Sequence, residues 1–363
     1  MSSESSVSNS VRHVMSEVQA GWTPHRYGVL LFAFLLAAGM GPRFQVFLLT
    51  EFMIVALFAL GFNLLFGYTG LLSFGHGMFY AGGAYGLAIV LKEVGPAIEA
   101  YLGAGISGGV SLLIGAIVGM LLVIIIAVPV GWLSVRMEQI YFALITLAFG
   151  MLVYSTIIQN PLDLTNGTDG IVILLGSVNI AGLEVRFGAR RTFYYLTLTI
   201  FGLLTFGMYR VINSPFGMVC QAIRESPARI GAIGVDVRRH RWAAFIISAV
   251  FVGIAGVLRA GLAGVASPEL SHWSTSAIAV IATVIGGASF FAGPIIGAFV
   301  FLYLRWAISR VPTLEAYWEF FFGLLIIGTV LYFKAGATGG LLALRRWASA
   351  FLKARAQTGG ERE

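Results

Sequence analysis

Long apolar stretches separated by short polar segments run through most of the chain. Stretches such as 44–66, 106–131 and 242–265 are long enough to cross a bilayer, which takes about 20 apolar residues. Their apolar positions are continuous rather than alternating, so of the two structures that lipid tolerates the pattern favours helices over a closed barrel. We therefore expect an all-α polytopic membrane protein with about ten transmembrane helices. The candidate spans are 27–42, 44–66, 71–91, 106–131, 140–158, 192–210, 242–265, 273–290, 293–310 and 313–333.

Glycine interrupts two of these spans. One glycine-rich cluster runs from Gly67 to Gly83 and another from Gly286 to Pro294. Both are too rich in glycine for a regular helix interior, and non-helical backbone at membrane depth is tolerated only inside protein or along a wet cavity. One break in each half of the chain is typical of a transporter with related halves. Whether spans 71–91 and 273–290 cross fully or re-enter stays open.

Glycines four residues apart also occur within or next to the spans. This spacing lets helix backbones approach closely in lipid, so we expect tight helix packing at these positions. The pairs are Gly82/Gly86, Gly105/Gly109, Gly115/Gly119 and Gly293/Gly297.

Charged residues make up only 11% of the chain and gather in a few segments. The loop 211–241 holds five arginines against two acids, and the tail 334–363 is also basic. Because basic residues accumulate on the cytoplasmic side, we expect both segments, and the polar residues 1–26, in the cytoplasm. The transmembrane domain then covers 27–333, with the balanced segment 159–191 outside. The net charge of +7 reflects these loops and anionic headgroups rather than nucleic acid.

The chain lacks the motifs that ATP binding, metal binding and nucleophilic catalysis require. The chain has no phosphate-binding G-x-x-x-x-G-K-[ST] loop, a single cysteine (Cys220), and no motif for a metal site or an activated nucleophile. We therefore expect no enzyme activity, no cofactor and no metal. Carboxylates inside the spans, which ion-driven carriers use, are also scarce.

Three of the ionisable residues inside spans nevertheless call for an explanation. Glu51 either lines a path or reaches the membrane interface a short distance away. Arg259 lies well inside its span and must pair or face water. His76, between two glycines, is either exposed to a path by the broken helix or buried and bonded to a neighbouring carbonyl. The sequence leaves these alternatives open.

Four stretches of the chain carry a family resemblance. They read GYTGLLSFGHG at 67–77, YFALITLAF at 141–149, FGMVCQAIRESPARIGAIGVDVRRHRWAAFIISAVFVGIAGVL at 216–258 and GGASFFAGPIIGA at 286–298. Their order and spacing over residues 45–335 resemble the permeases of branched-chain amino acid ABC importers, most of all the longer of the two permease subunits. Segments 164–170 and 240–242 depart from the common pattern. Urea and short-chain amide permeases share the family.

The resemblance implies a permease subunit of an ATP-driven importer in the bacterial inner membrane, with both termini cytoplasmic. It implies a homologous second permease, two cytoplasmic ATP-binding subunits and a periplasmic solute-binding protein as partners, besides membrane lipid. Branched-chain amino acids are the expected solutes, and urea or short-chain amides are the alternative. A secondary carrier that works alone is the competing class.

We expect the solute path to follow the two broken segments, because exposed backbone dipoles can handle polar groups without fixed charge. Thr146 either contributes a hydroxyl to this path or bonds a carbonyl of its own helix. The path candidates are Ser73, Phe74, His76, Phe79, Thr146, Gly286 and Gly287.

A short helix is expected within the basic loop. Ser226-Pro227 suits a helix start, and Gly234 suits the left-handed position after its end. Ile230 and Ile233 then share one face and would anchor the helix in a cleft of an ATPase subunit. The candidate coupling residues are Arg224, Glu225, Arg229, Ile230, Ile233 and Gly234.

Overall fold

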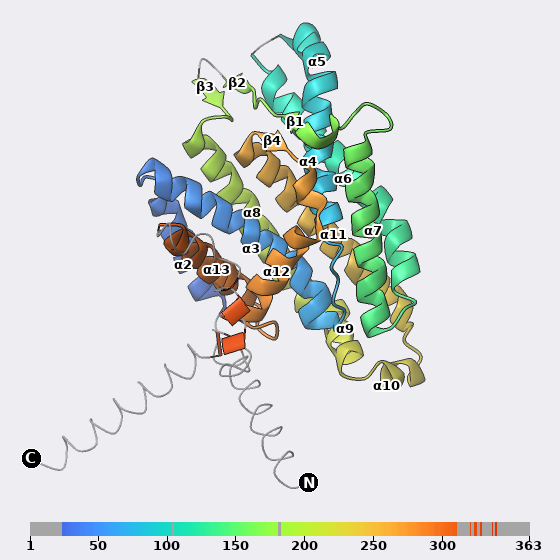
Figure 1. Cartoon of the computed structure of the whole chain (residues 1–363). Coiled ribbons are helices and arrows are strands. Elements are labelled where there is room, and N and C mark those ends of the chain that lie inside the picture. The colour runs from blue at the N-terminus through green and yellow to red at the C-terminus, as the bar shows by residue number, and fades with distance from the viewer. Residues whose placement is uncertain are drawn as a thin grey trace, which may run out of the picture.

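The computed structural model describes residues 24–103, 105–180 and 183–310, and single positions between 320 and 339. The described part is a bundle of helices with a few short strands at one end (Figure 1). Its longer helices are α2 (Pro24–Ala38), α3 (Arg43–Thr69), α4 (Gly77–Ile89), α6 (Ser107–Ser134), α7 (Gln139–Gln159), α8 (Arg190–Ile212), α9 (Pro215–Glu225), α11 (Val237–Ala263), α12 (Trp273–Gly286) and α13 (Gly293–Ser309). Its shorter helices are η1 (Val90–Val94), α5 (Gly95–Leu102), η2 (Gly167–Asp169), α10 (Pro227–Ala232) and η3 (Pro268–Ser271).

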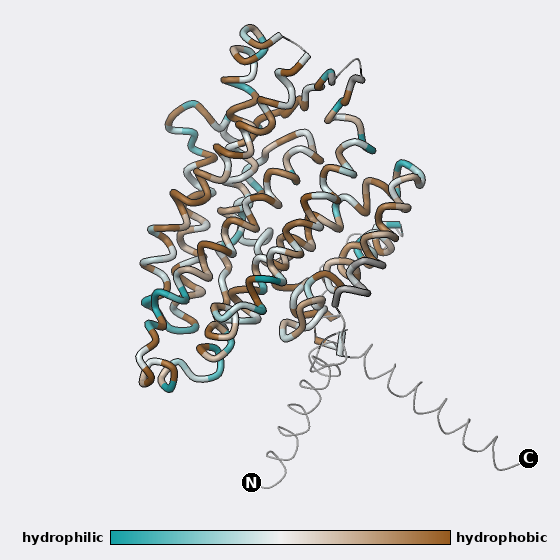
Figure 2. Tube along the Cα trace, turned by 180° about the vertical axis from the view of Figure 1, so that it is seen from behind, coloured by the Kyte–Doolittle hydropathy of each residue, from teal (hydrophilic) through white to brown (hydrophobic). Residues whose placement is uncertain are grey.

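Two long helices form the centre of the bundle. In the most apolar windows of α3 and α11, 89% and 67% of the residues are buried, against 28% in α6, α7 and α8. α11 packs against α3, α4 and α6, while α3 also contacts α8, α12 and α13. The outer helices present apolar side chains away from the core, and the apolar colour runs along the helices in Figure 2. Helices that are apolar on every side are expected where one face meets protein and another meets lipid.

The expectation of about ten full spans is not confirmed. In the part of the chain that the structure describes, five helices are long and apolar enough to cross a membrane: α3, α6, α7, α8 and α11. α4 runs without a break through η1 into α5, so its helical segment covers residues 77–102. α2, α12 and α13 have 15, 14 and 17 residues. At about 1.5 Å per residue they fall short of a hydrocarbon core of about 30 Å. Span 313–333 lies almost entirely outside the described residues. The protein is a multi-pass helical membrane protein.

Glycines hold the central helices close together, as their spacing predicts. A methyl group at Gly256 of α11 would overlap the Tyr80 carbonyl of α4, and one at Gly86 of α4 would overlap Gly119 of α6. Gly293 and Gly297 likewise face the backbone of α12. The expectation is wrong for Gly105, where an added methyl group would come no closer than 3.9 Å to the Asn179 side chain. Gly105 lies in the loop before α6 rather than on a helix face.

The segment between α7 and α8 contains structure that the all-α expectation did not include. β1 (Ile171–Val172) pairs antiparallel with β4 (Val265–Ala266), and β2 (Ser177–Ile180) with β3 (Leu183–Arg186). These strands and α5 lie at the opposite end of the bundle from α9 and α10 (Figure 1). Loops 159–191 and 211–241 are therefore on opposite sides, as the charge pattern predicts.

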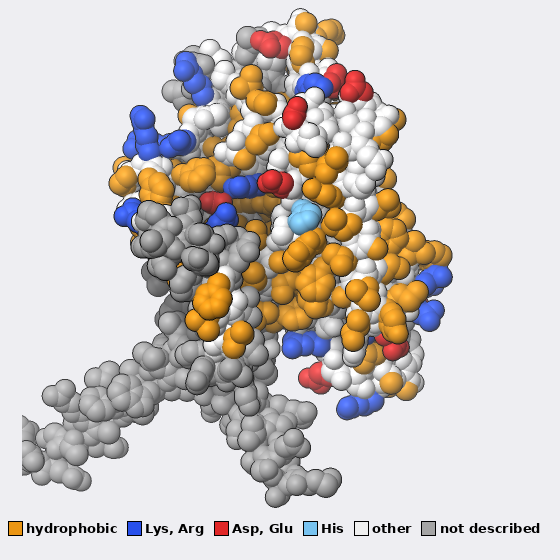
Figure 3. Space-filling model, in the orientation of Figure 1, with side chains coloured by type: hydrophobic (Ala, Val, Ile, Leu, Met, Phe, Trp, Pro, Cys, Tyr) orange, Lys and Arg blue, Asp and Glu red, His pale blue; other side chains and the backbone are white. Residues whose placement is uncertain are grey.

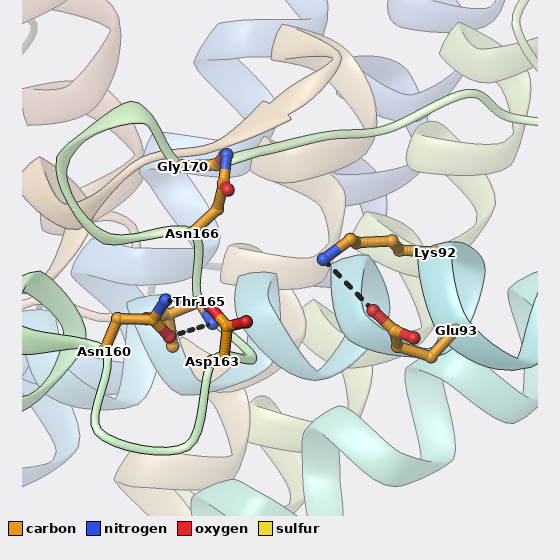
Figure 4. A network of polar contacts seen from close by, with 7 residues as sticks. All are labelled: Lys92, Glu93, Asn160, Asp163, Thr165, Asn166 and Gly170. Atoms are coloured by element: carbon orange, nitrogen blue, oxygen red, sulfur yellow. Dashed lines mark hydrogen bonds and ion pairs between the residues drawn. The ribbon is translucent and has the colours of Figure 1, made fainter.

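Side-chain amides order the turn that follows α7. The Asn160 Oδ1 accepts from the Thr165 backbone N–H at 2.8 Å, and the Asn166 amide donates to the Gly170 carbonyl at 2.8 Å (Figure 4). Asn160 and Asn166 have positive φ, which asparagine tolerates better than most residues. An exposed ion pair, Lys92 with Glu93 at 3.1 Å, lies beside this turn.

Candidate functional site

The first broken segment, residues 70–76, connects α3 to α4 without helical structure. Gly70 ends α3 in the left-handed conformation, with φ +79°, and its N–H and that of Leu71 bond carbonyls in the last turn of the helix. α4 then begins at Gly77. The predicted break is present, and it lies between helices rather than inside one.

A hydrogen-bonded chain of side chains fixes this segment. The His76 Nδ1 lies 2.8 Å from the Ser73 hydroxyl, and its Nε2 lies 2.8 Å from the Ser248 hydroxyl of α11. Ser248 donates in turn to the Gly61 carbonyl of α3 at 2.6 Å. His76, Ser73 and Ser248 are fully buried. Of the two alternatives for His76, the structure shows the buried one, although its partners are hydroxyls rather than a carbonyl.

α7 and α12 close around the same segment. Gly75 packs so tightly on α7 that a side chain there would overlap the Thr146 carbonyl. The Thr146 hydroxyl donates to the Ala143 carbonyl of its own helix at 2.9 Å, and Thr146 is buried. The Gly77 N–H donates to the Ser276 hydroxyl of α12 at 2.8 Å.

The sequence reasoning missed Ser248 and Ser276. The sequence does show that each is a hydroxyl residue within an apolar stretch, which indicates a need for a hydrogen-bond partner. It does not show which group that partner is.

The second broken segment, residues 287–292, joins α12 to α13. α12 ends at Gly286, and Gly287 has φ +102°, which only glycine adopts easily. The Ala288 carbonyl lies so close to Gly67 that no side chain would fit at Gly67. The Thr338 hydroxyl donates to the Gly286 carbonyl at 2.6 Å. Both broken segments therefore adjoin the end of α3.

The path candidates differ in exposure. Phe74 is half-buried, whereas the other candidates face the interior of this chain. Phe79 contacts the rings of His76 and Phe245 edge to face. The structure thus gathers the candidates of the first segment with Thr146, and it places Gly286 and Gly287 on a second segment beside α3.

The short helix expected in the basic loop is present as α10. Pro227 is its first residue, and Gly234 follows its end with φ +92°. The N–H groups of Gly234 and Val235 bond the carbonyls of Gly231 and Ile230, at 3.0 and 3.4 Å, which is the Schellman pattern. Ser226 has the extended backbone of an N-cap, but its side chain makes no capping bond, contrary to the role expected of it.

The apolar face of α10 has little cover. The Ile233 side chain is 75% exposed, and Ile230 is partly buried. Glu225 and Arg229 are exposed. Charged side chains of both signs gather at this end of the molecule (Figure 3).

The preceding helix, α9, joins this end to the core. The Arg224 guanidinium donates to the Gly67 carbonyl near the end of α3, where a cation is favoured. Cys220 is fully buried, and burial raises the pKa of its thiol to about 11. α9 is therefore packed on the bundle, while α10 projects from it.

An ion pair links α3 to α11 within the membrane-spanning part. The Arg259 Nη1 lies 3.1 Å from the Glu51 Oε1. Arg259 meets the expectation of a partner. The Glu51 carboxylate is turned toward α11, a contact that neither of its two expected explanations included.

Comparisons with known proteins agree on a family. A family model described as branched-chain amino acid transport system, permease component, matches residues 44–330. The high-affinity branched-chain amino acid transport system permease protein LivM of Escherichia coli K12 is 31% identical over 269 residues, which are 68% of this chain and 60% of LivM. LivH of the same strain is 27% identical over 296 residues, 78% of this chain and 91% of LivH.

The similarity extends more weakly to a sugar permease. The xylose transport system permease protein XylH of Escherichia coli K12 is 29% identical over 157 residues, 41% of this chain and 37% of XylH. No solved structure matches the chain. The chain spans about 60% of the length of LivM. Because the family model covers most of the sequence and the glycine-broken segments lie within it, the chain belongs to the family of permease components of branched-chain amino acid transport systems.

Proposed function

We propose that this chain is a permease subunit of an ATP-driven importer that carries branched-chain amino acids. The family match over residues 44–330 carries the proposal, and the similarity to the branched-chain amino acid permeases LivM and LivH supports the solute class. A second, homologous permease would complete the pore, two ATP-binding subunits would supply energy, and a periplasmic binding protein would deliver the solute. The chain itself would act as a transport subunit and not as an enzyme.

The proposed solute path follows the first broken segment. Phe74, half-buried, would contact the solute, with Ser73, His76, Phe79 and Thr146 holding the segment in shape. Gly286 and Gly287 would allow the second segment to approach α3. The buried hydrogen bonds to Ser248 and Ser276 support this division, because a non-helical segment needs partners for its polar groups.

The proposed coupling element is α10. Its exposed Ile233, with Ile230 beside it, suits an apolar cleft on an ATP-binding subunit. Arg224, Glu225 and Arg229 lie next to this face, and Gly234 ends the helix. A helix of two turns is marginally stable alone, so a partner would help to hold it. Arg224, just before α10, contacts the end of α3 next to the first broken segment, so a movement of α10 could be transmitted to that segment. The protein would reside in the bacterial inner membrane. The end of the bundle that carries α10 would lie in the cytoplasm, and so would both chain termini.

Reconstitution tests the function. The tagged chain, purified in mild detergent from its native host, should bring two ATP-binding subunits and a second permease with it. Vesicles containing this complex and the binding protein should take up leucine only with ATP. Uptake of urea or short amides in place of leucine would assign the alternative solute class, and uptake by the chain alone would contradict an importer subunit.

Variants of α10 test the coupling role. Ile230→Asp and Ile233→Asp should each weaken retention of the ATP-binding subunits, since a truncated anchor costs about 2 kcal/mol or more. Leu162→Asp is the matched control, because Leu162 is 77% exposed and lies in the turn after α7, at the other end of the bundle. Normal retention and full uptake in both isoleucine variants would remove α10 from coupling.

A further inference from the structure

The ion pair between Glu51 and Arg259 stands out because of its place. Glu51 lies about two turns into a helix whose most apolar window is 89% buried, and Arg259 lies about one turn from the end of α11. Charges at membrane depth are costly and mark functional positions by default. A pair that served only to join two helices could be replaced by apolar side chains without loss.

The geometry leaves both partners able to bind something else. A single contact, Nη1 to Oε1 at 3.1 Å, joins them. A guanidinium has five donors and a carboxylate has two oxygens with several acceptor positions, so most of their capacity is unused by this contact. Their side chains are 31% and 19% exposed. The pair is therefore accessible at its edge, unlike the sealed cluster around His76.

Tyr80 extends the same place toward the core. Tyr80 belongs to α4, its ring stacks on Phe58 at 4.7 Å, and its backbone carbonyl packs against Gly256, about one turn before Arg259 on α11. The charged pair thus adjoins an aromatic, apolar wall. A solute with two opposite charges and an aliphatic side chain would find a partner for each of its parts.

We infer that Glu51 and Arg259 bind the α-ammonium and α-carboxylate of a zwitterionic amino acid during its passage through the permease. This assignment rests on the proposed function and adds the residues that recognise the solute. The pair is neutral as a whole and so is the zwitterion, so neither leaves an uncompensated charge. An anion would be repelled by Glu51 and a cation by Arg259, whereas an uncharged amide would offer neither residue an ionic partner in exchange for the contact between them.

Exchanging the charges of Glu51 and Arg259 distinguishes a solute-binding role of the pair from a purely structural one. In the vesicles described above, Glu51→Gln and Arg259→Gln should each lower leucine uptake about tenfold or more, the loss of one charged hydrogen bond. The double variant Glu51→Arg, Arg259→Glu rebuilds the bridge with its direction reversed. It should unfold at the wild-type temperature yet leave leucine uptake low. Restored uptake in this double variant would overturn the inference.

The matched control exchanges an ion pair of the same length elsewhere. Lys92→Glu with Glu93→Lys should keep wild-type uptake, because this exposed pair at 3.1 Å has no part in the proposed site. A wild-type complex that takes up no amino acid would refute the proposed function itself. A wild type that takes up leucine beside fully active glutamine variants would refute only the binding pair.

A second measurement leaves the ion pair unchanged, so it tests the inference even if the variants of Glu51 and Arg259 fail to assemble. Phe47 lies one turn before Glu51 on the same side of α3 and is partly exposed. In an otherwise wild-type complex, saturating leucine should slow maleimide labelling of Phe47→Cys at least about twofold, whereas an uncharged amide should not. Equal labelling rates with and without leucine would overturn the inference.

Discussion

His76 has no contact with solvent, and its two ring nitrogens connect three parts of the fold. Through Ser73 it holds the segment 70–76, and through Ser248 it reaches α11 and the Gly61 carbonyl of α3. The rings of Phe62, Phe79 and Phe245 surround it edge to face. One imidazole thus satisfies polar groups that an apolar interior could not solvate.

Replacing this histidine should reduce stability. His76→Ala removes two hydrogen bonds and leaves a cavity, so it should lower the free energy of unfolding by about 3 kcal/mol. Thermal unfolding of the purified chain in detergent, followed by tryptophan fluorescence, measures the effect. Ser274→Ala, at an exposed serine of α12, serves as control. Unchanged stability together with altered solute uptake would instead assign His76 a direct place in the path.

At the scale of elements, the distance between backbones is set by glycine. α4, a helix of 13 residues that η1 and α5 continue, contacts both α6 and α11. The contacts work because Gly83, Gly86 and Gly256 have no side chain that would collide with a neighbouring backbone. Glycine at these positions therefore lets the helix backbones approach closely in a membrane.

Two alanine substitutions test this packing against helix propensity. Gly256→Ala should destabilise the protein by about 2 kcal/mol, because the added methyl group would overlap the Tyr80 carbonyl. Gly207→Ala in α8 has open space around it, and helix propensity alone should make it neutral or stabilising by about 0.5 kcal/mol. Both are read as unfolding temperatures in the same detergent. Equal effects at the two sites would contradict close packing of α4 on α11.

At the scale of the whole molecule, the two ends of the bundle differ in kind. One end carries the short strands and the asparagine-rich turn, and the other carries α9, α10 and the arginines of the loop 211–241 (Figure 1). The basic loop should face the cytoplasm and the turn should face outward.

Cysteine labelling in intact cells tests this orientation. Thr168→Cys should react with a membrane-impermeant maleimide, and Ala228→Cys should react only after permeabilisation, because both positions are exposed but at opposite ends. The reverse result would invert the proposed topology.

The native cysteine provides the background for this labelling experiment. Its thiol is buried, and with a pKa near 11 rather than 9.0 it holds about a hundredfold less thiolate than an ordinary cysteine. Cys220 should therefore stay unlabelled at neutral pH until the protein is denatured. Because the folded state keeps this proton longer than the unfolded state, any loss of stability from it begins only as the pH rises above about 9.

The sequence by itself determined the membrane class, most helix positions, the two glycine breaks, the start and end of α10, and the family. These follow from local properties: runs of apolar residues, glycine's lack of a side chain and the turn preferences of serine, proline and glycine. They hold for a short stretch of chain whatever surrounds it.

Only the tertiary structure decided which residues meet. His76 bonds Ser248, 172 residues away, Arg259 pairs with Glu51, 208 residues away, and Arg224 caps α3 at Gly67, 157 residues away. It also showed that α12 and α13, which a broken segment joins, are each too short to span the membrane as single helices. Buried polar groups need a partner, but the sequence does not say which one, since the choice depends on how the helices pack.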